Sequence, residues 1–249
     1  MKYVTKARIL VDTWTRDRVL GTVPLEIHIL SFLRERPHRN LCEMVSFFED
    51  EKHYYVEMTP FGRPGTDLFD WIEVHSAMTE AEAKSIFHQT CLAIQHLHEQ
   101  CRIVHRDIKD ENVVLDNAGR VKLIDFGSAA YLKDGPFDTF HGTLDYASPE
   151  VLGGKKYAGP GQDVWAAGIL LYTMLYKENP FYNVMSYWTR ELIPQVDEIL
   201  DHDLRIPYIL SNESIDLIQK MLDRDLSTRP TISQVLTHPV NSPFLKTDV

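Results

Sequence analysis

Cysteine is scarce in this chain, and long apolar runs are missing. The 249 residues include only Cys42, Cys91 and Cys101, with neither a Cys-x-x-Cys spacing nor a cluster of cysteine and histidine. Because an odd number of thiols cannot pair completely, we expect buried free thiols rather than a disulfide scaffold or a zinc site. No apolar stretch approaches the roughly 20 residues of a membrane-spanning helix, and the first residues lack signal-peptide character. We therefore expect a protein without membrane contact, located in the cytoplasm, with the nucleus as a second compartment.

Positive charge is also in deficit. The chain has 26 Lys and Arg against 36 Asp and Glu, which gives a formal net charge of -10 at pH 7. A nucleic-acid-binding surface would need a basic face that neutralises phosphates, so we expect no nucleic-acid partner. The acidic balance favours basic partners, although plain solubility explains it equally well.

The remaining composition is ordinary, and the first third of the chain predicts a small sheet with one helix. Residues 42–48 and 53–57 are rich in β-branched and aromatic residues, and the polar residues 49–52 predict a hairpin turn between them. Residues 24–33 place Ile27, Leu30 and Leu33 on one helical face, and the break at 61–65 predicts a linker.

The rest of the chain is predicted to be mostly helical. Thr79 and Glu82 form a capping-box signature ahead of an apolar helical repeat. The other predicted elements are a short hairpin over 113–115 and 121–124, a buried helix over 164–176, and amphipathic helices over 214–222 and 231–237.

The residues that carry chemistry lie in two short motifs. The first is His105-Arg106-Asp107-Ile108-Lys109-Asp110-Glu111-Asn112, and the second is Asp125-Phe126-Gly127. Phosphoryl transfer needs several charges fixed around a magnesium-bound triphosphate. Asp107 would accept the proton of a substrate hydroxyl, and Lys109 would neutralise the moving phosphoryl group. Asn112 and Asp125 offer oxygen ligands to Mg²⁺. Each residue alone is typical of a solvated surface, but both motifs at this spacing predict phosphoryl transfer from a magnesium-bound triphosphate.

These motifs resemble the protein kinase family, and the resemblance covers nearly the whole chain. Ser148-Pro149-Glu150 stands where the family usually has Ala-Pro-Glu, and Arg229 is at the position that makes a buried ion pair with Glu150. Asp163 matches the aspartate that holds the catalytic-loop backbone, although capping of the 164–176 helix is an equally good reading. His105 is expected to pack with Phe126, Met44 and Leu30 in a column that joins two lobes.

The segment between Asp125 and Glu150 would present the substrate. Thr139 is at the family's usual phosphorylation position, and Arg106 would pair with the phosphate, although an unmodified loop threonine is the alternative. Thr143 matches the residue that hydrogen-bonds the catalytic aspartate in serine/threonine kinases, and Lys109 also favours that class over tyrosine kinases.

In the small lobe, the resemblance implies a lysine that holds the α- and β-phosphates and pairs with Glu26. The lysine is expected to be Lys2, with Lys6 as the alternative. A Gly-x-Gly-x-x-Gly loop is expected to be missing upstream of Lys2, so we expect a truncated small lobe with weakened ATP binding. A fragment of a longer kinase and a degenerate protein both explain this, and the intact catalytic loop favours the fragment.

A narrower resemblance is to the PAS kinases, nutrient-responsive serine/threonine kinases with an upstream sensory PAS domain. It rests on residues 9–14, 20–24, 108–112, 123–131 and 176–181 and is closest to the fungal members. The match implies an adenine pocket backed by Val56, with a hinge over 57–59 that includes Glu57 and Thr59. Val114 would form the floor of the adenine pocket, and Ile124 would precede the metal-binding Asp125. Carboxylates expected at the ribose or at basic substrate residues are Asp67, Asp70 and Glu111. Helix capping is the alternative for Asp67 and Asp70.

We therefore expect an α+β, bilobal protein kinase fold. The incomplete, mostly β small lobe would span 1–59, the linker 60–66 and the mostly α large lobe 67–249. The predicted protein is a monomer that phosphorylates Ser or Thr preceded by basic residues in protein substrates, in nutrient or carbohydrate signalling, with an upstream PAS region as a partner. The alternatives are an interaction module with little catalysis and, less favoured, an unrelated phosphate-binding enzyme.

Overall fold

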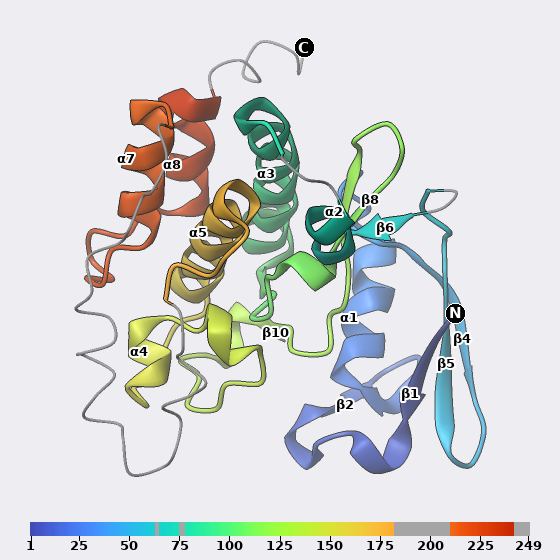
Figure 1. Ribbon diagram of the computed structural model, residues 1–249. Helices are drawn as coiled ribbons and strands as arrows, with labels where there is room; N and C mark the ends of the chain where they lie inside the picture. The colour runs from blue at the N-terminus through green and yellow to red at the C-terminus, as the bar shows by residue number, and fades with distance from the viewer. Residues whose placement is uncertain (63–64, 75–77, 182–209, 242–249) are drawn as a thin grey trace.

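The computed structural model describes residues 1–62, 65–74, 78–181 and 210–241, and it has two lobes (Figure 1). The predicted linker residues Arg63 and Pro64 lie outside the described residues. The small lobe is built on an antiparallel sheet in the order β1 (Lys2–Thr5), β5 (His53–Met58) and β4 (Met44–Glu49). The predicted β4–β5 hairpin is present. Its turn is held by Asp50, whose Oδ1 accepts hydrogen bonds from the backbone N–H groups of Lys52 and His53, each at 2.7 Å.

Helix α1 (Leu25–Arg34) packs against this sheet and lies between it and the large lobe (Figure 1). The helix begins one residue later than the predicted range, because Pro24 still belongs to β3 (Gly21–Pro24). The hairpin of β2 (Trp14–Asp17) and β3 was not predicted. Its turn is closed by the Asp17 carboxylate, which accepts from the N–H groups of Val19 and Leu20 at 2.6 and 2.8 Å.

The large lobe is mostly helical. The capping box of Thr79 and Glu82 is present at the start of α3 (Glu80–Gln95), and a π-helical turn over His96–Cys101 follows that helix. The predicted buried helix is α5 (Pro160–Tyr176), which begins four residues before the predicted range. The other helices are α2 (Leu68–Val74), α4 (Pro149–Leu152), α7 (Asn212–Met221) and α8 (Ile232–Thr237).

Short strands support the loops between the lobes. One sheet has the order β6 (Thr66–Asp67), β8 (Val113–Leu115) and β9 (Val121–Leu123), and a second pairs β7 (Ile103–Val104) with β10 (Ala130–Tyr131). Thr66, which we placed in the linker, pairs with Leu115. The β8–β9 hairpin is the predicted one.

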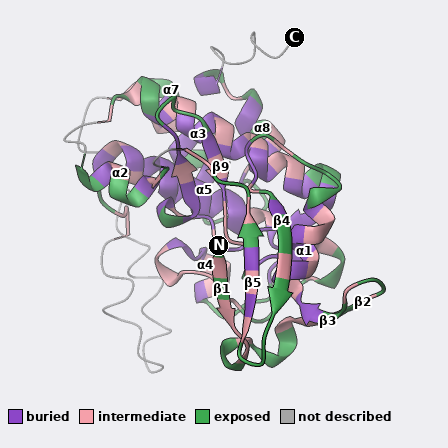
Figure 2. Ribbon diagram, turned by 90° about the vertical axis from the view of Figure 1, so that its right-hand side faces the viewer, coloured by how far each residue is buried: buried purple, intermediate pink, exposed green. Residues whose placement is uncertain are grey.

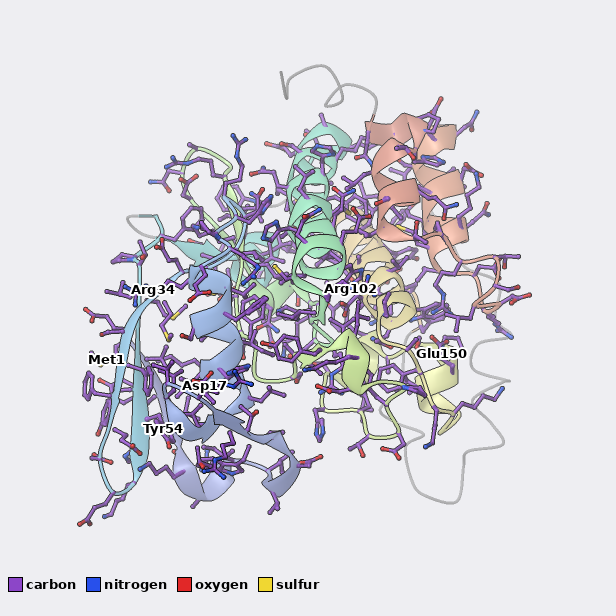
Figure 3. The ribbon with its side chains drawn as sticks, turned by 180° about the vertical axis from the view of Figure 1, so that it is seen from behind. Met1, Asp17, Arg34, Tyr54, Arg102 and Glu150 are labelled. Carbon is purple, nitrogen blue, oxygen red and sulfur yellow. The ribbon has the colours of Figure 1, made fainter. Side chains whose placement is uncertain are left out.

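One hydrophobic core runs through both lobes, from Val56 in β5 to Trp165 in α5. Figure 3 labels Tyr54 of β5 on the small lobe and Glu150 of α4 on the large one. Among the described residues, no helix combines the length and apolarity needed to cross a bilayer. Cys91 and Cys101 are buried as expected, whereas Cys42 is only half-buried.

Candidate active site

Asp163 anchors the loop that carries the first motif. Its two oxygens accept from the backbone N–H groups of His105 and Arg106 at 2.9 and 2.7 Å, and His98 Nε2 lies 2.8 Å from Oδ2. Burial opposes its ionisation, but the His98 contact and these hydrogen bonds hold the pKa of Asp163 below its usual range. Helix α5 is capped at Gly159 instead, so the capping alternative for Asp163 is wrong.

Asp107 is held by hydrogen bonds at both carboxylate oxygens. Oδ1 accepts from the backbone N–H and the hydroxyl of Thr143, each at 2.8 Å, and Oδ2 accepts from Asn112 Nδ2 at 3.0 Å. Asn112 Nδ2 also donates to the Asp107 carbonyl at 2.8 Å. The predicted contact between Thr143 and Asp107 is therefore present.

Lys109 lies beside this carboxylate. Its Nζ is 3.9 Å from Asp107 Oδ2 and forms an ion pair with Glu111. Burial lowers the pKa of Lys109, but the carboxylates of Glu111 and Asp107 outweigh burial and raise it above its ordinary value. Lys109 is therefore a cation at the position that we predicted for the moving phosphoryl group.

The β8–β9 hairpin brings the second motif next to the first. The Ile124 N–H donates to the Asn112 carbonyl at 2.9 Å, so Asp125 follows directly after a backbone contact with Asn112. Asp125 has a φ of 62°, an uncommon backbone conformation for a residue other than glycine, and its Oδ1 accepts from the Gly127 N–H at 3.0 Å.

His105 supports this hairpin by packing and by one hydrogen bond. Its Nε2 is 3.0 Å from the Ile124 carbonyl, and its ring centroid is 5.1 Å from that of Phe126. His105, Phe126, Met44 and Leu30 are all buried in the core. Burial lowers the pKa of His105, which favours the neutral ring that the packing role requires.

Lys2 of β1 links the two lobes through its contacts with Glu26 and Asp125. Its Nζ donates to Glu26 on α1 and, at 2.9 Å, to Asp125 Oδ1. The alternative lysine, Lys6, pairs with Glu49 instead, so Lys2 is the partner of Glu26. Burial disfavours the charged ammonium, but the two carboxylates prevail and raise the pKa of Lys2. The same ammonium outweighs burial at Asp125 and lowers the pKa of that carboxyl.

A cavity of about 450 Å³ opens beside these charges. Six residues predicted for the site line it: Lys2, Glu26, Thr59, Val114, Ile124 and Asp125. Met58, which belongs to the predicted hinge over 57–59, also lines it, and the prediction missed Cys42, Phe61 and Lys122. Met58 continues the inward alternation of Tyr54 and Val56 along β5, a period-two signal that agrees with its place in the predicted hinge. Although Cys42 as a whole residue is half-buried, burial of its thiol group raises the pKa of Cys42 to about 12, so the thiol stays protonated.

Other residues predicted for nucleotide or substrate lie outside this cavity. Val56 is fully buried opposite Lys2, and the exposed Glu57 accepts a hydrogen bond from Ser46 Oγ at 2.7 Å. Asp67 Oδ1 accepts from the Asp70 N–H at 2.8 Å, at the start of α2. The capping alternative therefore describes Asp67, and ligand roles for Glu57, Asp67 and Asp70 stay predictions.

Thr139 and Arg106 line one further cavity, of about 290 Å³. Thr139 is exposed, and Arg106 is buried, with its Nε donating to the Ser128 carbonyl at 2.6 Å and its guanidinium 4.5 Å from the Phe137 ring. The same cavity is lined by Asp12, Asp134 and Asp138. A phosphate on Thr139 would therefore meet one cation and several carboxylates.

Glu150 and Arg229 form the predicted ion pair. Arg229 Nη1 and Nη2 donate to the two Glu150 oxygens at 2.8 and 3.0 Å, and Nη1 also donates to the Gly161 carbonyl. The Arg229 guanidinium lies 5.1 Å from the Trp165 ring of α5. This pair ties α4, and with it the end of the substrate-presenting segment, to the lobe core.

The donor set suits a magnesium ion that also binds phosphates. Asn112 Nδ2 is engaged by Asp107, which leaves the amide oxygen as the group that can ligate, and Asp125 adds a carboxylate. Within the described ranges, no group of three His, Cys, Asp or Glu side chains could hold a metal alone. Mg²⁺ is commonly bound through one or two protein oxygens together with substrate phosphates, so these residues fit it.

Comparisons with known proteins agree with this geometry. The family model described as "Protein kinase domain" matches residues 1–241. Serine/threonine-protein kinase ppk6 of Schizosaccharomyces pombe is 51% identical over 238 residues, which cover 96% of this chain and 29% of ppk6.

Two further relatives are also named as serine/threonine-protein kinases. Serine/threonine-protein kinase PSK1 of Saccharomyces cerevisiae is 53% identical over 238 residues, which cover 94% of this chain and 17% of PSK1. The PAS domain-containing serine/threonine-protein kinase of Mus musculus is 38% identical over 247 residues, 97% of this chain and 17% of that protein. The chain spans less than a third of the length of these relatives. With the matched family model and the assembled motifs, these similarities show that the chain belongs to the protein kinase domain family.

Proposed function

We propose that this chain is a serine/threonine protein kinase domain that transfers the γ-phosphate of ATP to a hydroxyl of a protein substrate. The observation that carries the proposal is the position of Asp107. Thr143 and Asn112 fix its carboxylate, and the β8–β9 hairpin places Asp125 and its partner Lys2 beside the same loop. The printed names of the relatives support the Ser/Thr class.

Each group has a distinct task in this proposal. Asp107 Oδ1 already accepts two hydrogen bonds, so Oδ2 is the oxygen that takes the proton of the attacking hydroxyl. Lys109 is close enough to balance negative charge that develops near that oxygen. Lys2, oriented by Glu26, holds the phosphates nearer the adenine cavity. Asn112 and Asp125 would hold Mg²⁺, which when bound would neutralise charge on the phosphates.

We extend the proposal to the PAS kinases because of the blocks noted in the sequence and the printed name of the mouse relative. A sensory PAS region elsewhere in the polypeptide and a role in nutrient or carbohydrate signalling belong to it. Substrates with Arg or Lys ahead of the Ser or Thr are supported by the acidic charge balance and by the exposed carboxylates of Asp70 and Glu111.

A transfer assay tests the proposal. Purified chain is incubated with ATP labelled at the γ-phosphate, Mg²⁺ and a serine peptide with arginines before the serine, and the label in the peptide is counted. We expect transfer by the unsubstituted chain, and loss of transfer with retained ATP binding in Asp107→Asn, because only the proton acceptor is removed.

Two outcomes count against the proposal. Equal transfer by the unsubstituted chain and by Asp107→Asn would show that Asp107 is not the proton acceptor. ATP binding without any transfer by the unsubstituted chain would favour an interaction module over a catalyst.

A further inference from the structure

Three aromatic side chains form a row across the outer face of the small-lobe sheet. Tyr3 of β1, Tyr55 of β5 and Phe48 of β4 are direct neighbours in the strand register. The rings of Tyr3 and Tyr55 meet edge to face at 5.3 Å, and those of Phe48 and Tyr55 stack at 4.8 Å with an interplanar angle of 9°. We call Tyr3, Tyr55 and Phe48 the outer aromatic row.

This row faces away from the core. Along β5 the buried residues are Tyr54 and Val56, so Tyr55 between them is on the opposite face. Tyr3 is 65% exposed and Phe48 is 51% exposed. Figure 2 shows this sheet at the front of the molecule, with exposed positions along β4. None of the three side chains lines the cavity of about 450 Å³ beside Lys2 and Asp125. Phosphoryl transfer does not account for the exposure of Tyr3 and Phe48.

The row is held rigid before any partner arrives. The Tyr55 hydroxyl donates to Asp50 Oδ2 at 2.7 Å, and Asp50 Oδ1 is fixed by two backbone N–H groups of the hairpin turn. The Tyr55 ring therefore cannot swing freely, and it supports both neighbouring rings. A fixed aromatic surface loses little conformational entropy on binding, which favours recognition.

The charges around the row are negative. Between Met44 and Met58 the hairpin carries four acidic residues, Glu49, Asp50, Glu51 and Glu57, against one lysine, and of these Glu49 is paired with Lys6 from outside the hairpin. The hydrogen bond from Tyr55 and those from the turn lower the pKa of Asp50 to about 2, so it is ionised at neutral pH. Glu57 lies two positions beyond Tyr55 on the same face of β5 and is exposed. Aromatic faces beside carboxylates attract guanidinium and ammonium groups.

We propose that the outer aromatic row is a docking surface for a basic protein segment, whose Arg or Lys side chains lie over the rings while Asp50 and Glu57 balance their charge. Charge complementarity selects this occupant. A second copy of the chain would bring another net charge of -10, and nucleic acids or anionic membranes would also be repelled. The inference goes beyond phosphoryl transfer and does not depend on it.

The test uses a short peptide of alternating arginine and leucine as the probe, with a glutamate–leucine peptide as its charge-reversed control. Binding to the intact chain is measured by titration calorimetry, and ring signals of isotopically labelled tyrosine are followed by NMR. We expect the arginine peptide to bind and to shift the Tyr3 and Tyr55 signals, and raised salt to weaken binding.

Variants separate this surface from the substrate site, which is also proposed to take basic residues. Tyr3→Thr combined with Phe48→Thr removes two exposed rings, and we expect affinity for the arginine peptide to fall about fivefold or more. Glu57→Gln weakens binding to a smaller extent. Leu226→Thr, which alters another exposed apolar side chain on the large lobe, leaves affinity unchanged. Thermal unfolding confirms that each variant is folded.

Three results would overturn the inference. They are absence of binding by the unsubstituted chain, equal affinity for the glutamate peptide, and unchanged affinity in the folded double variant. None of them bears on the transfer assay, so the proposed function would stand or fall separately.

Discussion

At the scale of single residues, Asp107 is held more tightly than a solvent-exposed carboxylate would be. Thr143 contributes two of its hydrogen bonds, one from the backbone N–H and one from the hydroxyl. The hydroxyl bond can be removed alone, because substitution of the side chain leaves the N–H in place. Asp107 is thereby linked to the segment that presents the substrate.

Thr143→Val tests this link. Loss of a hydrogen bond to a charged group costs roughly 1.5 to 3 kcal/mol, so we expect the transfer rate to fall about tenfold or more with little change in affinity for ATP. Thr143→Ser restores the hydroxyl and should recover most of the rate. Steady-state kinetics on the three proteins provide the measurement, and a valine variant as fast as the serine variant would contradict the role.

Most of the residues that meet at the site could be predicted from the sequence, because two short motifs carry them. Lys2 was harder to identify. The β2–β3 hairpin lies between Lys2 and its partner Glu26 in the chain, and the sequence does not reveal the path of that hairpin. His98 was missed, because its contact with Asp163 joins two helical segments far apart in the chain. Cys42, Phe61 and Lys122 were missed because cavity lining depends on how the lobes close.

At the scale of secondary-structure elements, the Glu150–Arg229 pair joins α4 to the loop before α8. Burial opposes ionisation of Glu150, but Arg229 outweighs burial and lowers the pKa of the carboxyl. A carboxylate with a lowered pKa stabilises the fold above its unfolded pKa, and this contribution is lost as the pH falls through the folded pKa.

Glu150→Gln should therefore lower the free energy of unfolding by about 3 kcal/mol at neutral pH, because it leaves a buried guanidinium without its counter-charge. The difference from the unsubstituted chain should shrink below the ordinary glutamate pKa of about 4.3. Urea unfolding at several pH values measures both effects. Lys156→Gln, in an exposed pair with Asp138, serves as control and should cost less than about 1 kcal/mol. A constant difference at all pH values would contradict the assignment.

Gly142 keeps the substrate-presenting segment close to the catalytic loop. A Cβ at this position would lie 2.2 Å from the Arg106 carbonyl oxygen and 2.6 Å from the Phe140 ring. Because the carbonyl belongs to the anchored loop, Gly142→Ala should displace Thr143 and reduce transfer at least about tenfold. Gly119→Ala, where a Cβ meets nothing within 4 Å, should retain transfer and lose only about 1 kcal/mol of stability. Equal transfer by the two variants would show that the close approach is unimportant.

Elements with local signals were predicted well, and elements without them were not. The β4–β5 hairpin and α3 were predicted because turn residues and a capping box mark them in the sequence. The β2–β3 hairpin carries no comparable signal in its sequence, and its turn depends on the Asp17 side chain. The start of α5 was placed too late because Pro160 and Gly161 are poor helix formers inside a helix, although proline suits its first turn.

At the scale of the whole molecule, the two lobes meet through a chain of charges. Lys2 on β1 donates one hydrogen bond to Glu26 on α1 and another to Asp125 after β9. The small lobe is therefore tied directly to the predicted metal ligand, Asp125. The bilobal α+β architecture was predicted through the family resemblance rather than from periodicity.

Our central claim is that Asp107, Lys109, Asn112 and Asp125 surround one site for a magnesium-bound nucleotide. The most direct test is calorimetric titration of the chain with ATP in the presence and absence of Mg²⁺, repeated with Asp125→Asn. We predict that Mg²⁺ strengthens ATP binding to the unsubstituted chain and has little effect on Asp125→Asn. Binding that is equally strong with and without Mg²⁺, or a metal effect that persists in Asp125→Asn, would contradict the claim.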